Sequence, residues 1–398
     1  MKKNILLLSN AYYPSIGGIE NSLRHLAQEA QKNGDIPKII VSDIGVHKNE
    51  NRFYAVVEGV DVKRYPLSPK SNWMKIFNPF FSIYEHYKIL KNEKLKSNDE
   101  NTIVIARFHY SAYLAHLAGF KNVRYVVPSV YKNQLKVEPN TSIFQKIKQK
   151  ARLLIHNFIQ KKSLLHSENY VFSKTMERQC IELAGDASKP YIITKPGVDE
   201  SRFYPVSYEK KKSLRQKLGL PVDKPIVLFV GRFVAAKGVS ILLDAFAKLN
   251  TDATLVLVGE GTEHQVYINK ISLLGLNDRV MIFPPTREVE QFYQSADLFA
   301  MTSNYEPLGQ TILEAMAAGL KIIAFRPSVI IDTAIEELKI NNVVSYVEHY
   351  SPFDLASVLE NCVSTETLIH SQQSTKELNV PSYTWKSLYK ELVKDGYK

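Results

Sequence analysis

The sequence predicts an α/β protein made of two Rossmann-like domains, and two observations support this prediction. Apolar strand segments such as "KNILLLSN" (3–10) and "KIIVSD" (38–43) alternate with amphipathic helical segments in the first half of the chain. The same order restarts at "KPIVLFVGRF" (224–233) and continues through "DLFAMTS" (297–303). Strands that alternate with helices form parallel sheets with helices on both faces. A chain of 398 residues is long enough for two domains of about 100–200 residues each.

The first domain is predicted over residues 1–195. Its first strand is followed by a Pro/Gly loop and by a helix from about Ile19 to Lys32. The strand–helix order repeats in "TIVIARFHYSAYLAHLAG" (102–119) and "VRYVVPSV" (123–130). A polar, Pro-containing stretch of about 195–220 is interpreted as the linker between the domains.

The second domain is predicted over residues 196–380, and a separate helix is expected over 381–398. The segment "YTWKSLYKELVKDGYK" (383–398) is aromatic and follows the last predicted strand. We expect it to pack back on the first domain rather than to extend the second sheet. Two facing parallel sheets would leave a cleft between the domains as the natural ligand site.

Composition places the chain among ordinary globular proteins. Hydrophobic residues make up 45% and charged residues 23% of the sequence, which is typical of a protein with a sizeable core. Two cysteines provide neither a disulfide framework nor a metal site. There is no run of about 20 apolar residues, and the apolar run near the start is too short for a signal peptide. We therefore expect a cytoplasmic protein.

Positive charge is concentrated in the first half of the chain. Residues 1–200 hold 30 Lys and Arg against 18 Asp and Glu, whereas the remainder holds 21 against 22. The excess peaks in 142–166, which has six basic residues and no acid, and whose Ile, Leu and Phe recur at helical spacing. This pattern predicts an amphipathic helix with a cationic face. Three interpretations stay open: a solvated helix, contact with an anionic membrane or lipid-linked substrate, and nucleic-acid binding.

Two glycine-containing loops follow predicted strands. Gly17-Gly18 would let a ligand approach the backbone, and the helix that follows offers amide groups to an anion. A simple turn explains the same residues. Neither this pair nor Gly259 and Gly261 completes the three-glycine dinucleotide fingerprint, which weakens a nicotinamide-dependent oxidoreductase.

Cations follow the first strand of the second domain. Arg232 comes directly after the strand, and Lys237 lies five residues later, before the helix "VSILLDAFAKL" (239–249). Both could bind a diphosphate and neutralise the charge of a leaving group. No Asp-x-Asp pair occurs in the sequence, so no metal is expected to supply that charge. Standing alone, the two residues could equally be surface cations.

Two glutamates lie eight positions apart in "NYEPLGQTILEAMAAG" (304–319). Pro307 suits the first turn of a helix, so the amides from about Leu308 to Thr311, including those of Gly309 and Gln310, would meet a ligand. Glu306 and Glu314 would accept hydrogen bonds from sugar hydroxyls. We expect Arg232 and Lys237 to balance them through a phosphate ligand rather than through direct salt bridges.

The chain resembles the GT-B glycosyltransferases of family 4, also called group 1 glycosyltransferases. The resemblance covers most of the chain and includes the pattern Glu, seven residues, Glu. It is carried by the following segments: "YYPSIGGIENSLRHLA" (12–27), "KPGVDESRFYP" (195–205), "GRFVAAKG" (231–238), "LVLVGEG" (255–261), "FPPTREVEQFYQSADLFAMTS" (283–303), "EPLGQTILEAMAAG" (306–319) and "YTW" (383–385).

The resemblance implies a role for each matching residue. Arg232 and Lys237 would bind the diphosphate, Glu314 the ribose, and Glu306 the donor sugar near its anomeric carbon. The implied donor-binding set is Gly17, Gly18, Arg232, Lys237, Pro284, Glu306, Leu308, Gly309, Gln310, Thr311 and Glu314. The implied catalytic set is Glu306, His109, Arg232 and Lys237. Family members retain the anomeric configuration and need no metal or other cofactor.

This sequence departs from the family in two places. A His-x-His stretch that often follows a strand of the first domain is here "ARFHY" (106–110), so Arg107 replaces one histidine and His109 is left to line the sugar pocket. A lone histidine can also be structural. The stretch "FRPSVIID" (325–332) stands where the family usually has Gly-Gly and Pro-Glu, so the donor sugar cannot be inferred from relatives.

We therefore expect a retaining, metal-independent glycosyltransferase that uses a nucleotide-diphosphate sugar, with the acceptor bound by the basic first domain. The charge of 142–166 favours a glycan or lipid-linked acceptor at the inner face of the cell membrane, as in cell-surface glycan synthesis. A soluble acceptor stays open, and no nucleic-acid partner is expected. The alternative is a non-catalytic nucleotide-sugar or glycan-binding module on the same fold.

Overall fold

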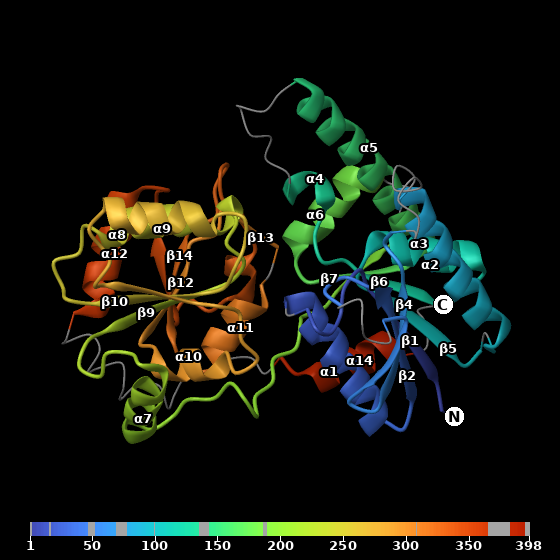
Figure 1. The fold of residues 1–398 in the computed structure, drawn as a ribbon, viewed down its shortest axis with the longest axis horizontal. Helices are drawn as coiled ribbons and strands as arrows, with labels where there is room; N and C mark the ends of the chain where they lie inside the picture. The colour runs from blue at the N-terminus through green and yellow to red at the C-terminus, as the bar shows by residue number, and fades with distance from the viewer. Residues whose placement is uncertain are drawn as a thin grey trace. The chain divides into compact units, whose positions relative to one another are not determined.

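The structure is a computed structural model of the chain. It describes residues 2–15, 17–46, 52–68, 78–98, 100–134, 143–185, 189–307, 309–364 and 383–394. The chain divides into two compact units. The first unit is Met1–Gly197 together with Trp385–Lys398, and the second unit is Val198–Thr384 (Figure 1).

The first unit is built on an eight-stranded sheet in the order β3-β4-β2-β1-β5-β6-β7-β8. All neighbouring strands are parallel except the hairpin of β3 and β4. The strands are β1 (Asn4–Leu8), β2 (Ile36–Ser42), β3 (Tyr54–Val57), β4 (Val60–Tyr65), β5 (Thr102–Ala106), β6 (Val123–Val126), β7 (Glu168–Val171) and β8 (Tyr191–Ile193). The helices are α1 (Gly18–Lys32), α2 (Asn78–Leu95), α3 (His109–Ala118), α4 (Tyr131–Gln134), α5 (Ile143–His166), α6 (Lys174–Ala184) and α14 (Trp385–Val393).

Apolar periodicity explains why these segments fold as they do. In α1 the buried residues Leu23, Leu26, Ala27 and Ala30 recur three and four positions apart, so they share one face of the helix. The central strand β1 is buried along Ile5–Leu8 because helices cover both faces of a parallel sheet.

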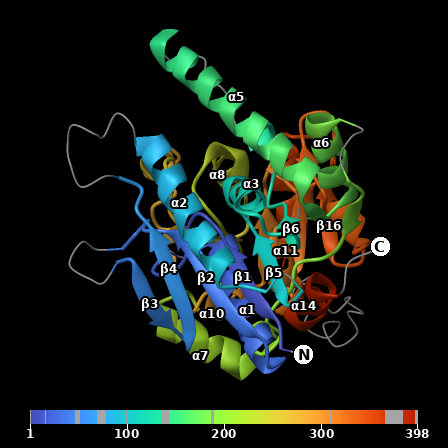
Figure 2. The same ribbon diagram turned by 90° about the vertical axis from the view of Figure 1, so that its right-hand side faces the viewer.

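Helix α5 is 24 residues long and reaches beyond the other helices of its unit (Figure 2). Its C-terminal half packs on α3, where Ser163 Oγ donates a hydrogen bond of 2.6 Å to the His109 carbonyl. The helix predicted over 142–166 is thus confirmed, although residue 142 lies outside the described residues. Among the helices of the described chain, none is both long enough and apolar enough to cross a membrane.

The second unit contains a six-stranded parallel sheet in the order β11-β10-β9-β12-β14-β16 and a small parallel pair of β13 and β15. The strands are β9 (Ile226–Val230), β10 (Thr254–Val258), β11 (Val280–Phe283), β12 (Leu298–Met301), β13 (Tyr305–Glu306), β14 (Lys321–Phe325), β15 (Asp332–Thr333) and β16 (Val344–Val347). The helices are α7 (Tyr208–Leu218), η2 (Ala235–Lys237), α8 (Val239–Phe246), α9 (His264–Leu273), α10 (Glu290–Ser295), α11 (Gln310–Ala317), η3 (Ile335–Leu338) and α12 (Pro352–Val363).

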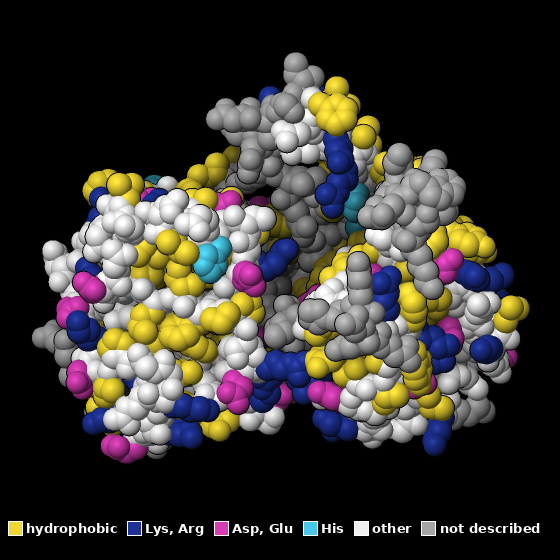
Figure 3. All heavy atoms as spheres, viewed as in Figure 1, with side chains coloured by type: hydrophobic (Ala, Val, Ile, Leu, Met, Phe, Trp, Pro, Cys, Tyr) yellow, Lys and Arg dark blue, Asp and Glu magenta, His cyan; other side chains and the backbone are white. Residues whose placement is uncertain are grey.

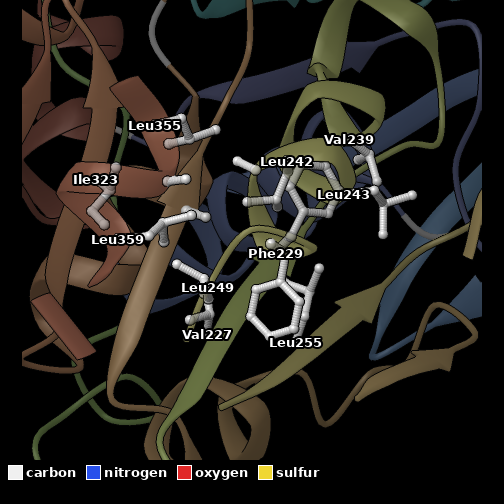
Figure 4. Packing of buried hydrophobic residues seen from close by; sticks show 14 of the residues in the cluster. Val227, Phe229, Val239, Leu242, Leu243, Leu249, Leu255, Ile323, Leu355 and Leu359 are labelled. Atoms are coloured by element: carbon white, nitrogen blue, oxygen red, sulfur yellow. The ribbon is translucent and has the colours of Figure 1, made fainter. Parts of the chain in front are cut away.

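A continuous apolar core holds this sheet to its helices. Figure 4 shows Val227 and Phe229 of β9 packed beneath Leu242 of α8 and close to Leu359 of α12. Each of these side chains is at most 2% exposed. Burying such a side chain typically contributes about 1.5–3 kcal/mol. This core fixes the positions of the strand ends from which the loops of the candidate site emerge.

The linker predicted over about 195–220 is wrong in its second half. Residues 208–218 form α7, which packs on α10 within the second unit. The buried Arg215 binds Asp297 at 2.6 Å and the Ser295 carbonyl at 2.8 Å. The polar composition of α7 reflects these contacts and its exposed outer face rather than a flexible connection.

The chain passes between the units twice, at Gly197–Val198 and at Thr384–Trp385. These two passages are paired, because Val198 bridges Thr384 in parallel and donates its N–H to the Tyr383 carbonyl at 2.7 Å. A side chain on Gly197 would lie 2.5 Å from the backbone nitrogen of Trp385. Glycine is therefore required for the close approach of the two segments.

Candidate active site

The loops after β9 and β12 meet at the carboxyl edge of the second unit's sheet, because these strands are neighbours. Lys237 ends the short helix η2 after β9, and Glu306 lies in β13 after β12. Gly238 has a φ of +66°, and any side chain there would overlap the Thr302 carbonyl. Thr302 Oγ1 also donates a 3.0 Å hydrogen bond to the Lys237 carbonyl. The glycine thus allows the two loops to pack together.

Lys237 and Glu306 form a direct ion pair through Nζ and Oε2. Glu306 is only 7% exposed, and a buried carboxylate needs a cation or several donors nearby. The expectation that the glutamates and cations would be linked only through a phosphate ligand is therefore wrong for this pair. The packing of the two loops, which joins residues 69 positions apart, supplies the physical reason.

Gly309 lies directly against the Glu306 carboxyl group. A Cβ atom at Gly309 would be 2.8 Å from Glu306 Cδ, so a side chain there would displace the carboxylate. Gly309 is also the N-cap residue of α11, which begins at Gln310 and includes Thr311. The helix therefore starts later than the expected first turn at Pro307. Leu308, which was predicted to bind the donor, lies outside the described residues.

Glu314 is half-buried on α11 and faces α10. Tyr293 Oη donates a 2.9 Å hydrogen bond to Glu314 Oε2. Burial raises the pKa of Glu314 to about 7; the Tyr293 hydrogen bond and Arg202 oppose this shift, and Glu290 adds to it. The carboxyl is therefore close to half-protonated at neutral pH, unlike an ordinary surface glutamate.

The sequence analysis did not identify the side chains that surround Glu314. Tyr293 is fully buried and packs edge-on against Phe203, with ring centroids 5.4 Å apart. Arg202 forms an ion pair with Glu290, and its carbonyl accepts a 2.9 Å hydrogen bond from Gln294. Arg202 and Tyr293 both lie inside motifs quoted above, but the sequence alone does not show which of their residues approach Glu314.

Two more predicted donor-binding residues follow strands of the same sheet. Arg232 follows β9 and is exposed, and its guanidinium has no ion pair or hydrogen bond to any residue that the structure describes. Pro284 follows β11 and is also exposed. The second unit thus gathers Arg232, Lys237, Glu306 and Glu314 at the carboxyl-edge loops and α11.

The remaining predicted residues belong to the first unit. Gly17 is the N-cap residue of α1 and Gly18 is its first residue. The carboxylate of Glu20 lies over Gly17, only 2.5 Å from where a Cβ atom would be. This small residue therefore makes room for an acid of its own helix, and its donor-binding role stays a prediction.

His109 begins α3 and is buried, with 6% of its surface exposed. Its Nε2 lies 2.9 Å from Nδ1 of His156 on α5, and the His156 ring stacks on Tyr131 at 3.9 Å. Burial, together with His156, lowers the pKa of His109 to about 3. The structure thus places a neutral histidine pair between α3 and α5. The catalytic role of His109 stays a prediction.

Comparison with known proteins finds a family model that matches most of the second unit. Residues 210–368 match the model of the family described as "Glycosyl transferases group 1". The D-inositol 3-phosphate glycosyltransferase of Xylanimonas cellulosilytica is 33% identical over 141 residues, 33% of this chain and 34% of that protein. The lipopolysaccharide core biosynthesis glycosyltransferase LpsE of Rhizobium meliloti is 37% identical over 112 residues, 28% of this chain and 33% of that protein. The chain thus matches about a third of the length of these curated relatives.

Solved structures extend the similarity to the whole fold. The crystal structure of Anabaena HepE in complex with UDP and glucose matches with a TM-score of 0.72. The match covers 98% of both chains at 19% sequence identity. This likeness confirms the predicted α/β class with two Rossmann-like domains.

Proposed function

Because residues 210–368 match the model of the group 1 glycosyltransferases, we propose that the chain transfers a sugar from a nucleotide-diphosphate sugar to an acceptor hydroxyl. One observation carries the proposal. Lys237, Glu306 and Gly309 are in contact beside the first turn of α11, and Glu314 lies farther along the same helix. Cations, helix amides and carboxylates in one place match the phosphates and hydroxyls of such a donor.

The donor's diphosphate is proposed to lie against Arg232 and Lys237. The bond between the anomeric carbon and the diphosphate oxygen breaks, and the acceptor oxygen bonds to the same face of that carbon. The acceptor proton passes to the departing diphosphate. Because the new bond forms on the same face, the proposed reaction retains configuration. The cations face the growing negative charge and stabilise the transition state, so no metal or other cofactor is proposed.

Glu306 is proposed to bind the donor sugar near its anomeric carbon. Its ion pair with Lys237 holds the carboxylate in place, and the absence of a side chain at Gly309 makes room for it. A lysine ammonium has three donors, so Lys237 can hold Glu306 and a phosphate oxygen at once. The amides near Gln310 and Thr311 lie in the same turn.

Glu314 is proposed to bind the ribose. Tyr293 occupies Oε2, which leaves Oε1 for a ribose hydroxyl. A carboxyl whose pKa is near 7 can either donate or accept that hydrogen bond. We propose that Pro284 lies beside the base and that Gly17, Gly18 and His109 contribute from the first unit.

The acceptor is proposed to be a glycan or a lipid-linked molecule used in cell-surface glycan synthesis. The similarity to LpsE, a lipopolysaccharide core enzyme by its description, supports this class. The net positive charge of residues 1–200 supports an acceptor near an anionic surface. We accordingly propose a cytoplasmic protein that docks on the inner face of the cell membrane.

Helix α5 supplies the proposed membrane contact. Its exposed apolar side chains are separated by three, seven, one and three positions, which places them on one side of a helix. They are Phe144, Ile147, Leu154, Ile155 and Phe158, between 55% and 77% exposed.

Basic residues flank this apolar face. They are Lys146, Lys148, Lys150, Arg152, Lys161 and Lys162. Figure 3 shows hydrophobic side chains beside Lys or Arg over the projecting end of α5. The opposite side of the helix packs on its own unit through Gln160 and Ser163. An apolar face with basic borders is typical of a helix that lies in the surface of an anionic bilayer.

The donor and the metal requirement are tested together. The full chain is incubated with a panel of nucleotide sugars that begins with UDP-glucose, because Anabaena HepE was solved with UDP and glucose. Release of nucleotide diphosphate and sugar is followed with and without EDTA. We expect turnover with at least one donor, unchanged by EDTA, and release of the α anomer of the sugar from an α-linked donor. Activity that disappears with EDTA would refute metal independence, and binding of a donor without any turnover would support the non-catalytic alternative.

A further inference from the structure

Arg107 is a buried guanidinium that the rest of the first unit leaves almost unsatisfied. It is 7% exposed. Its Nε is buried without any hydrogen-bond partner, and Nη1 donates only one long bond, 3.4 Å, to the Val126 carbonyl. The remaining contact places the guanidinium carbon 5.1 Å from the centre of the Phe172 ring. Within the described part of the chain, no carboxylate is within ion-pair distance of it.

Two other buried arginines of the described chain are used fully. Arg215 is 6% exposed and bonds through all three nitrogens to one carboxylate and three carbonyl groups. Arg124 is 4% exposed and binds Glu168 at 3.1 Å as well as two carbonyl groups at the end of α14. Leaving a buried charge unpaired is costly, so an architectural role alone explains Arg107 poorly.

Arg107 lies where open parallel sheets bind ligands. The order of the eight strands changes direction between β1 and β5, and ligands bind beyond the carboxyl ends of the strands at such a switch point. Arg107 is the first residue after β5, and its N–H is bonded to the carbonyl of Leu8, the last residue of β1, at 2.8 Å. Its guanidinium reaches toward the ends of β6 and β7, at Val126 and Phe172.

The charge of Arg107 is permanent at physiological pH. Burial lowers its pKa to about 10, while Tyr125 and Glu20 draw it back upward. Glu20 lies in the first turn of α1, two residues after Gly18. It acts on Arg107 across space, because no ion pair between the two is formed. A full positive charge is thus kept at the switch point.

We infer that Arg107 binds an oxyanion, a carboxylate or a phosphate, carried by the acceptor of the transfer. The planar fork of a guanidinium matches the two oxygens of either group. The unpartnered Nε shares one edge of that fork with Nη2, which forms no hydrogen bond to the described residues. That the anion belongs to the acceptor rests on the proposed function. The binding of an anion by Arg107 does not depend on sugar transfer.

Three sugars that differ in one group test the site on the full chain. Glucose is neutral, glucuronate carries a carboxylate, and glucose 6-phosphate carries a phosphate. Their binding is measured by saturation-transfer NMR at constant ionic strength. We expect at least one anionic sugar to bind at least tenfold more tightly than glucose, and the preferred sugar identifies carboxylate or phosphate. Equal affinity for all three would overturn the inference, whether or not any variant folds.

Variants at Arg107 assign the preference to this residue. Arg107→Met keeps the length of the side chain and removes the charge, so the anionic sugar should bind no better than glucose. Arg107→Lys keeps the charge but not the fork, and should retain part of the preference. Phe172→Leu, which removes the ring beneath the guanidinium, should keep the anion preference. Thermal unfolding checks that each variant is folded, and an undiminished preference in folded Arg107→Met would refute the assignment.

The same samples separate this inference from the proposed function. UDP-glucose turnover of the wild-type chain is recorded beside the sugar titrations. Anion preference without turnover of any nucleotide sugar would contradict the proposed transfer and leave the Arg107 site standing. Turnover without anion preference would support the proposed transfer and contradict the Arg107 site.

Discussion

Glu306 and Glu314 have the same side chain and opposite surroundings. Glu306 is paired with a lysine, whereas Glu314 accepts a hydrogen bond from the buried Tyr293. The sequence pattern correctly indicates that both acids are placed on one short segment. It cannot reveal their partners, which are 69 and 21 residues away in the chain. Such pairings depend on how loops of different strands pack, and not on local spacing.

The pKa of Glu314 leads to a prediction about pH. The carboxyl is protonated more readily in the folded chain, at a pKa of about 7, than at its ordinary value of 4.5. Its contribution to stability is complete below pH 4.5 and is lost as the pH rises through 7. Glu314→Gln, which stays neutral, should therefore exceed the wild type in stability by about 1–3 kcal/mol at pH 8 and match it near pH 4.5. Urea unfolding at both pH values measures this, and an identical pH dependence of the two proteins would contradict it.

The Lys237–Glu306 pair allows stability and activity to be separated. Lys237→Met leaves Glu306 buried without its cation, which should cost about 1–3 kcal/mol of the free energy of unfolding. It should also lower kcat by about 10²–10³-fold because a charge that faces the leaving group is lost. The double variant Lys237→Met with Glu306→Gln removes both charges, so stability should largely return.

Activity of that double variant is the informative measurement. We expect kcat to stay as low as in Lys237→Met, because restored folding does not restore the cation. Recovery of kcat together with stability would show that the lysine acts only as a structural partner of Glu306. Denaturant unfolding and nucleotide-diphosphate release provide the two readouts.

At the scale of elements, helix α5 has two sides of different character. Its buried side fixes it to α3, and its outer side carries exposed apolar residues between lysines. Periodicity and charge predicted the helix itself, since both are local properties of 142–166. Which side faces the protein could not be predicted, because that depends on contacts with residues such as His109.

Membrane binding by α5 is expected to depend on its apolar face. Leu154→Gln and Phe158→Gln together should weaken binding to vesicles that contain anionic phosphatidylglycerol by at least about 100-fold, since each buried apolar side chain contributes about 1.5–3 kcal/mol. Leu273→Gln is the matched control, because Leu273 is 86% exposed on α9 of the other unit. Co-sedimentation with vesicles is the assay. Equal losses in the control, or unchanged binding in the double variant, would refute the docking surface.

At the scale of the whole molecule, the alternation of strands and helices was enough to predict both sheets. The hairpin of β3 and β4 was not predicted, because an antiparallel strand at the edge of the sheet does not change the alternation of strands and helices along the sequence. Likewise, α7 was predicted to be part of a linker because most of its residues are polar or charged. The sequence does not distinguish its one buried arginine, Arg215, which forms an ion pair with Asp297. The sequence therefore indicates architecture more reliably than it indicates which polar segments are ordered.

Helix α14 should carry much of the stability of the first unit, although it is last in the chain. Tyr389 donates a 2.6 Å hydrogen bond to Asp35, and Leu388 is 3% exposed. Leu388→Ala should cost about 2–4 kcal/mol, whereas Lys386→Ala on the exposed side of the same helix should cost less than about 0.5 kcal/mol. Fluorescence of the buried Trp385 during urea unfolding, in a Trp73→Phe background, reports the difference. Similar losses in both variants would contradict this assignment.

The paired passages at Gly197–Val198 and Thr384–Trp385 make the second unit an insertion within the first. Both of its ends leave the first unit at one point, so the insertion can in principle be exchanged as a cassette. The group 1 match, 210–368, falls wholly inside it. A chimera with the corresponding segment of a relative should change the donor and keep the vesicle binding of α5. Retention of the original donor by a folded chimera would disprove this modularity.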